Sequence, residues 1–198
     1  MPDESTGTGP FYNVTRLADD GARHVKGNLF LGSGIDVEMD GQPSQTSDGD
    51  DITDMDDEDG GVRIANSPDF WKMGTGQIEI TVTGGKGCLT AWMDFWDSAA
   101  NDLGTDGDFD DFNIGDCWSE VIIANLPVEG VQIVSFPLPV DAAKYPMFAR
   151  FRLLADEGQD GICEDQQAAQ LTGLVYDGEV EDYLFSFKPT ALELTTLD

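Results

Sequence analysis

Acidic side chains gather in three segments of the chain, at spacings that would let several carboxylates reach one metal ion. The first is the run at 48–59, DGDDITDMDDED; the second joins Asp94 to DGDF at 106–109 and to Glu120; the third is GEVEDY at 178–183. Carboxylates on loops of variable shape favour Ca²⁺ over other biological cations. We therefore predict calcium binding, with the candidate ligands Asp50, Asp51, Asp56, Asp57, Glu58, Asp59, Asp94, Asp106, Asp108, Glu120, Glu179, Glu181 and Asp182.

These residues suggest two calcium sites. One would use Asp57, Asp59, Glu179 and Glu181, and the other Asp94, Asp106 and Asp108. The acidic run has a simpler interpretation as a disordered segment. The glutamates of GEVEDY share one face of a predicted strand, where they could instead be solvated or paired with Arg150 and Arg152. The DGDF segment has the residue types of an EF-hand loop but neither its spacing nor helical flanks, so a calcium loop within a β-fold is favoured.

The charge balance restricts the partners. Ten Lys and Arg stand against 39 Asp and Glu, a net charge of −29, which disfavours nucleic acid and anionic membranes. No apolar stretch is long enough to span a membrane, so we expect no membrane insertion. Dense carboxylates repel one another unless cations lie between them. Because Ca²⁺ is abundant only outside cells, we expect an extracellular or cell-surface protein, although residues 1–20 lack the pattern of a signal peptide.

The three cysteines, Cys88, Cys117 and Cys163, allow one disulfide. We predict Cys117–Cys163, because both residues lie in irregular segments, with Cys88–Cys117 as the main alternative. The chain has no CxxC pair and one histidine, His24, so a zinc site is not expected. His24 is interpreted as a structural, hydrogen-bonded residue rather than a general base or ligand.

Strand patterns dominate, and the short segment 164–171 is the best helix candidate. Seven or eight strands with few helices predict an all-β fold, an antiparallel β-sandwich with long acidic loops at about 36–61 and 94–118. We expect an irregular lead-in or linker at 1–20, the domain at 21–187 and a C-terminal tail strand or inter-module linker at 188–198. The predicted strands are 24–31, broken by a turn at Gly27-Asn28, and 77–83, 88–95, 120–124, 131–138, 148–154, 179–187 and 190–197.

Seven segments resemble, in order, the GEVED domain, a module of bacterial secreted and cell-surface proteins. They are LADDGARHV (17–25), LFLGSGIDVEMDGQPS (29–44), DGDD with DDEDG (48–51 and 56–60), LTAWMDF (89–95), DGDF (106–109), RFRL (150–153) and DGEVEDY (177–183). The resemblance implies a β-rich adhesion-type module, often repeated in tandem, without catalytic activity. The chain departs from the family in an apparent insertion at 96–105 and in its opening PDESTGTGPFYN.

Together these observations predict a calcium-stabilised structural or adhesive module that contacts other modules or copies of itself, in tandem or as a filament. The alternative is a calcium-dependent carbohydrate-binding domain, with glycans stacked on one of Trp71, Trp96 or Trp118. Paired carboxylates alone do not indicate a hydrolase, and no nucleophile elbow or P-loop is present, so we expect no enzyme activity. The tail could pack on its own sheet or on a neighbouring subunit.

Overall fold

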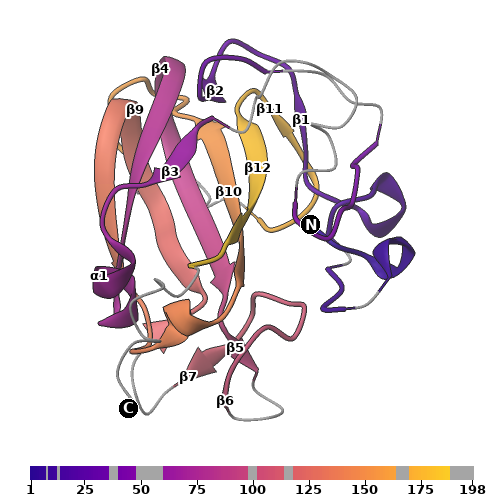
Figure 1. Cartoon of the computed structure of the whole chain (residues 1–198). Coiled ribbons are helices and arrows are strands. Elements are labelled where there is room, and N and C mark those ends of the chain that lie inside the picture. Colours follow the sequence, from indigo (N-terminus) through magenta and orange to yellow (C-terminus); the bar gives the residue numbers. More distant parts are fainter. Residues whose placement is uncertain are drawn as a thin grey trace, which may run out of the picture.

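Antiparallel strands form most of the fold, as predicted. The computed structural model describes residues 1–7, 9–12, 14–35, 40–47, 60–97, 102–113, 118–163 and 170–187. Its central strand is β4 (Thr75–Asp94), which pairs along one edge with β9 (Val121–Pro137). The other edge of β4 pairs with β3 (Val62–Ile64), β2 (Phe30–Leu31) and β10 (Met147–Ala155), and β10 pairs with β12 (Glu179–Phe185). The resulting six-stranded sheet curls around the core (Figure 1), which confirms the all-β, sandwich-like prediction.

The remaining elements are short and surround this sheet. β1 and β11 form a parallel pair, while β5 with β6 and β7 with β8 are small antiparallel pairs. Among the described residues, no helix is long and apolar enough to cross a membrane. The bounds are η1 Glu4–Thr6, η2 Leu17–Asp19, β1 Arg23–Val25, α1 Pro68–Lys72, β5 Trp96–Asp97, β6 Asp102–Leu103, β7 Phe112–Asn113, β8 Trp118–Ser119, η3 Ala142–Lys144 and β11 Leu174–Tyr176.

The strand at β4 is longer than predicted, because two expected strands, 77–83 and 88–95, are one. They join through an irregularity between Val82 and Lys86, where Gly84 has φ +95° and its missing Cβ leaves room for the carbonyl of Asn28. β9 likewise unites the strands expected at 120–124 and 131–138. The break expected at Gly27-Asn28 within 24–31 is present, and it separates β1 from β2, which belong to different sheets. The strand expected at 190–197 and most of the helix candidate at 164–171 lie outside the described residues.

The second half of β4 is buried on both faces. On one face, Leu89, Ala91 and Met93 join the main core, which also holds the fully buried Trp71 of α1. On the other, Trp92 packs in a smaller cluster with Met1, Tyr12, Phe109 and Phe148. The first twelve residues, expected as a lead-in, therefore supply core side chains to this second face. Tyr12 of this second cluster donates a hydrogen bond to the buried Asp94 at the end of β4.

The disulfide joins Cys88 to Cys163, not Cys117 to Cys163 as predicted. Leu154 of β10 lies opposite Cys88, and the chain then turns at Asp156, whose carboxylate accepts hydrogen bonds from Gly158 N (3.1 Å) and Gly161 N (2.6 Å). This turn returns the chain to the sheet and places the two Cα atoms 5.8 Å apart, a normal disulfide separation. Cys117 lies outside the described residues.

Candidate functional site

Five carboxylates lie together where β4 ends and β9 begins; we call them the Asp94 cluster, defined as Asp94, Asp106, Asp108, Asp111 and Glu120. A carboxylate oxygen from each of Asp106, Asp108 and Asp111 lies within 4.8 Å of the others. Asp94 is the last residue of β4, and Glu120 directly precedes β9. The sheet thus fixes two carboxylates, and the loop after β6 brings three more to them.

Asp94 links the sheet to this loop. It is fully buried, and its Oδ2 accepts hydrogen bonds from Tyr12 Oη (2.5 Å) and Gly107 N (3.1 Å). Gly107 has φ +102°, and a side chain there would crowd the carbonyl oxygen of Phe11, so glycine is needed between the two loop aspartates. Asp94 Oδ1 is buried and has no hydrogen-bond partner among the described residues. A buried carboxylate oxygen without a donor is costly unless a cation contacts it.

Glu120 positions the loop. It is fully buried, and its Oε1 accepts hydrogen bonds from Phe95 N (3.0 Å) and Trp96 N (3.1 Å), while Oε2 accepts one from Asp111 N (3.3 Å). These three bonds hold the start and the end of the acidic loop against the sheet. Glu120 therefore organises the cluster, and Asp111, which sequence reasoning missed, contributes its carboxylate instead. The signal for Asp111 is present in DGDFDD, where two further acids follow Asp108, the second of them three residues on.

The electrostatics of the cluster disfavour full ionisation. The pKa of Asp94 is raised to about 7, chiefly by burial; the hydrogen bonds from Tyr12 and Gly107 oppose this rise, and the charges of Asp106 and Asp108 add to it. Burial raises the pKa of Glu120 to about 9, with the charge of Asp94 acting in the same direction. The pKa of Asp106 is raised by burial and then by Asp108 and Asp111. A divalent cation would relieve these costs by neutralising several carboxylates at once.

The acids of the GEVEDY motif are divided between two faces of β12. Glu179 and Glu181 are buried on the core side, where Glu179 Oε2 accepts a hydrogen bond from Leu31 N (2.6 Å) and Glu181 Oε2 accepts one from Tyr183 Oη (2.6 Å). Gly61 passes over Glu181 so closely that a Cβ would lie within 2.8 Å of both carboxylate oxygens. The acidic run that precedes Gly60 in sequence would supply the other expected ligands, Asp50, Asp51, Asp56, Asp57, Glu58 and Asp59, all outside the described residues.

Asp182 faces the opposite side of β12. The register places it beside Arg150, which donates from Nε to Oδ1 and from Nη2 to Oδ2, both at 2.8 Å. Asp182 therefore does not belong with the metal ligands expected at Glu179 and Glu181. The suggested pairing of Arg150 and Arg152 with the two glutamates is wrong for the same reason, because successive strand residues point to opposite faces.

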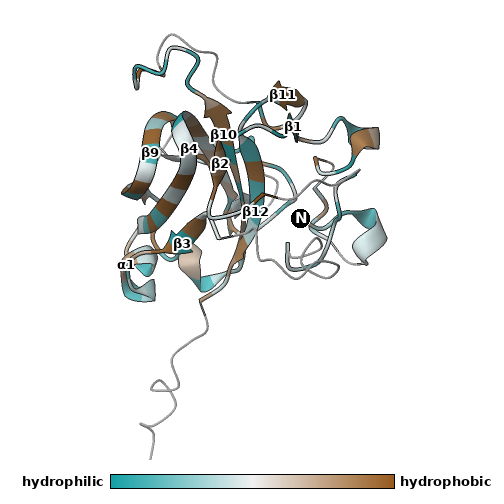
Figure 2. Cartoon of the chain, turned by 90° about the horizontal axis from the view of Figure 1, so that it is seen from above, coloured by the Kyte–Doolittle hydropathy of each residue, from teal (hydrophilic) through white to brown (hydrophobic). Residues whose placement is uncertain are grey.

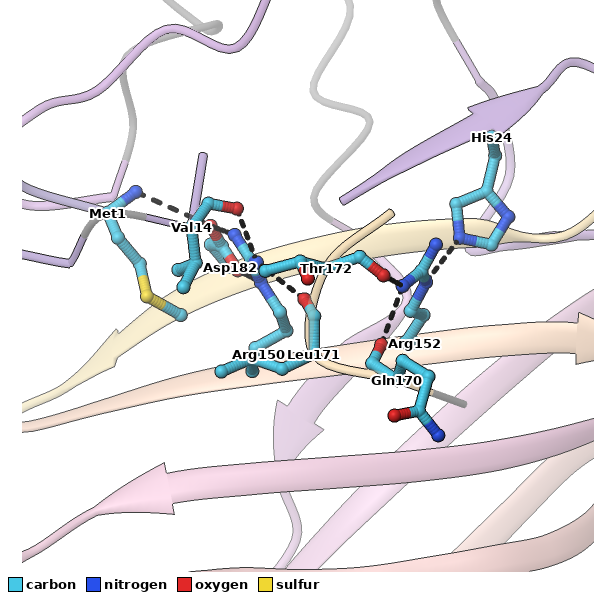
Figure 3. A network of polar contacts seen from close by, with 9 residues as sticks. All are labelled: Met1, Val14, His24, Arg150, Arg152, Gln170, Leu171, Thr172 and Asp182. Carbon is cyan, nitrogen blue, oxygen red and sulfur yellow. Dashed lines mark hydrogen bonds and ion pairs between the residues drawn. The ribbon is translucent and has the colours of Figure 1, made fainter. Parts of the chain in front are cut away.

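Arg152 is fully buried and holds the chain segment before β11 in place (Figure 3). Its guanidinium donates to the carbonyl oxygens of Gln170 (2.6 Å), Thr172 (2.5 Å) and Gly173 (2.6 Å), and its Nε donates to His24 Nε2 (3.0 Å). Because His24 Nε2 accepts from Arg152, Nδ1 must carry the proton that bonds to the Asp177 carbonyl oxygen at 2.8 Å. His24 is thus a neutral structural residue, as expected.

Acid should destabilise the fold through His24. Burial lowers its pKa to about 4, and the charge of Arg152 also lowers it, although the hydrogen bond to Asp177 opposes this. The folded pKa lies below the unfolded value of 6.5, so the contribution is fully present above pH 6.5 and is lost as pH falls toward 4. Between pH 7 and pH 5, we expect His24 to lower the free energy of unfolding by about 2 kcal/mol, and we expect this loss to be absent in His24→Gln. Urea unfolding of both proteins at the two pH values, in saturating Ca²⁺, measures this; equal pH dependence would contradict it.

The tryptophans do not form an exposed platform in the part of the chain that the structure describes. Trp71 is fully buried beside Phe136, Phe185 and Phe187, and Trp92 is buried in the second cluster. Trp96 is half-buried against the main core, and the side chain of Trp118 is not among those that the structure describes. Of the three tryptophans that the carbohydrate-binding alternative offered, Trp71 is therefore not available to stack on a sugar.

No family model, curated protein or solved structure matches the chain. The resemblance to the GEVED domain therefore stays a prediction from the sequence motifs.

Proposed function

We propose that the chain is a calcium-stabilised structural or adhesive module of a secreted or cell-surface protein. The observation that carries this proposal is the Asp94 cluster. Three loop aspartates bring carboxylate oxygens within 4.8 Å of one another, the charges of Asp106 and Asp108 act on Asp94, and the buried Oδ1 of Asp94 has no hydrogen-bond donor among the described residues. Asp106, Asp108 and Asp111 would bind the ion from the loop, and Asp94 Oδ1 from the sheet. Ca²⁺ accepts six to eight oxygen ligands in flexible geometry, so carbonyl oxygens and water would complete the shell.

The ion would have a structural role. Tyr12 donates to Asp94, Gly107 donates to the same carboxylate, and Glu120 binds the N–H groups of both ends of the loop. An ion held here would fix the N-terminal segment and the acidic loop onto the end of the paired strands β4 and β9. Glu179 and Glu181, with the acidic run before Gly60, are the candidates for a second ion. Of these candidates, Glu179 and Glu181 lie among the described residues.

Calcium binding by these carboxylates also supports a location outside the cell. A fold that depends on Ca²⁺ at several carboxylates requires the concentrations found outside cells, and the Cys88–Cys163 disulfide persists in an oxidising environment. The GEVED-like motifs favour a module of a bacterial surface or secreted protein. We assign no catalytic role to the cluster, because Asp94 and Glu120 accept hydrogen bonds that organise the loop.

The test is calcium binding by titration calorimetry on the full chain. The double variant Asp106→Asn/Asp108→Asn should weaken binding at one site by roughly tenfold or more. The control Asp19→Asn/Glu157→Gln removes the same charge from two exposed residues outside the cluster and should bind as the unmodified protein does. Equal losses in the two variants would mean that the ion responds only to overall charge, and no measurable binding at millimolar Ca²⁺ would overturn the proposal.

A further inference from the structure

Exposed apolar side chains gather where α1 packs against η3. Two come from α1 and the residue that ends it, and two flank η3; each is 46–66% exposed. We call them the α1 patch, defined as Phe70, Met73, Val140 and Tyr145. The two segments are joined, because Asp141 N donates to Lys72 O at 2.8 Å. A Cβ on Gly74 would lie 3.5 Å from Cγ2 of Val140, so Val140 sits next to the end of α1.

The described part of the chain ends beside this patch. Its last residue is Phe187, whose ring centroid lies 5.0 Å from that of Trp71 in α1. Figures 1 and 2 both place α1 at the end of the sheet where β12 finishes. An extended chain advances about 3.3 Å per residue, so the chain from Phe187 to Leu192 reaches up to about 17 Å. Because α1 has only 5 residues, about 7.5 Å of helix, the whole patch lies within that reach.

The sequence that follows Phe187, KPTALELTTLD, has apolar residues at a spacing that suits the patch. Leu192 and Leu194 are two positions apart, so in an extended segment they point to one side and Glu193 points to the other. Contact between these leucines and the patch would remove apolar surface of both from water.

We propose that the tail, residues 188–198, lies across the α1 patch of its own chain. Leu192 and Leu194 would pack against Phe70 and Met73, and Glu193 would face solvent. The docked tail would cover the patch and hold the C-terminal segment against the domain.

Charge and connectivity favour the chain's own tail over a second copy. Two chains of net charge −29 repel each other, whereas the tail is covalently held at the patch at a high effective concentration. The patch itself does not repel an acidic segment as most of this surface would. Its two segments, 68–73 and 140–145, hold charges that balance, namely Asp69, Lys72, Asp141 and Lys144.

A double-mutant cycle in the full chain, melted in saturating Ca²⁺, tests the contact. The tail variant Leu192→Ala/Leu194→Ala should lower Tm by about 3–6 °C, because two leucines lose their apolar contact. The same tail change should have much less effect when Phe70→Ala/Met73→Ala is already present, since both pairs would belong to one interface.

The matched control places alanines on β11 instead, with Leu174→Ala/Tyr176→Ala at residues 50% and 76% exposed. In that background the tail change should keep its full effect. No effect of the tail change, or an equal effect in all three backgrounds, would overturn the proposal. Coupling that appears only at high protein concentration would assign the tail to a neighbouring copy and would also overturn it.

The methyl group of Met73 reports the contact directly by NMR of the full chain with isotope-labelled methionine methyl groups. Leu192→Ala/Leu194→Ala should shift the resonance of Met73, because the side chains packed on it are removed. The resonance of Met93, fully buried in the main core, should stay in place and serves as the internal control. An unchanged Met73 resonance would contradict the docked tail, and equal shifts of both methyl groups would contradict a local contact at the α1 patch.

Discussion

Adding Ca²⁺ to the chelated protein should raise its melting temperature by about 5–10 °C for each occupied site. An ion that binds only the folded state stabilises it by about 2.7 kcal/mol when its free concentration is one hundred times Kd. For a domain of this size, each kcal/mol raises Tm by about 2–4 °C. Two sites would therefore add about 10–20 °C. Calorimetric melts in Ca²⁺ and in chelator measure the shift, and an unchanged midpoint would contradict a structural calcium.

The variant Asp94→Asn separates the ion from the rest of the fold. Without Ca²⁺, the buried carboxylate is unfavourable, so its replacement by an amide should leave Tm unchanged or raise it. The amide oxygen can still accept the hydrogen bonds of Tyr12 and Gly107. With Ca²⁺, the same variant should lose most of the gain from this site. A loss of stability that is equal in chelator and in calcium would instead show that Asp94 acts only through its hydrogen bonds.

The positions of the strands could be predicted from the local alternation of apolar and polar residues, but the way in which the strands connect could not. Ile78, Ile80 and Val82 alternate with polar residues, which predicts a half-buried strand, and β4 places all three in the core. The junction at Gly84 resembles a turn in sequence because glycines usually end strands. Here it is an irregularity inside one strand, stabilised by pairing with β9 on the far edge. Only the tertiary partner decides between these two outcomes.

The candidate site was likewise predictable from the sequence only in part. Residue types alone predict Asp94, Asp106, Asp108 and Glu120 as ligands. The paired strands β4 and β9 bring them together through the bond from Gly107 N to Asp94 and the N–H groups bound by Glu120. Period-two alternation already separated Asp182 from Glu179 and Glu181, and applying it strictly would have removed Asp182 from the ligands.

The pairing of the cysteines could not be predicted from the alternation of residues along a strand. Cys163 reaches Cys88 only through the return of the chain at Asp156, whose carboxylate binds two N–H groups that follow it. That turn depends on three-dimensional contacts, including Asp156 N donating to Lys86 O, rather than on the spacing of cysteines.

Replacing Arg150 should cause one of the largest losses of stability available to a single substitution in this chain. The side chain is 2% exposed, and it donates to both oxygens of Asp182 and to the carbonyl oxygens of Val14 (2.7 Å) and Leu171 (3.0 Å). It therefore ties β12, the N-terminal segment and the segment before β11 to β10 (Figure 3). Burial alone would raise the pKa of Asp182, but the charge of Arg150 and the N-terminal ammonium hold it below its ordinary value.

Arg150→Met keeps the aliphatic volume and leaves Asp182 charged without its main partner. Removing one member of a buried ion pair costs about 3–5 kcal/mol, most of it from the charge left behind. Arg150→Met/Asp182→Asn removes that charge as well, so it should recover more than half of the loss. Urea unfolding of the unmodified protein, both single variants and the double variant, in saturating Ca²⁺, gives the coupling energy directly. The loss of stability in the double variant could instead equal the sum of the losses in the single variants. In that case the contacts of Arg150 with the carbonyl oxygens of Val14 and Leu171 dominate, and its pairing with Asp182 contributes little.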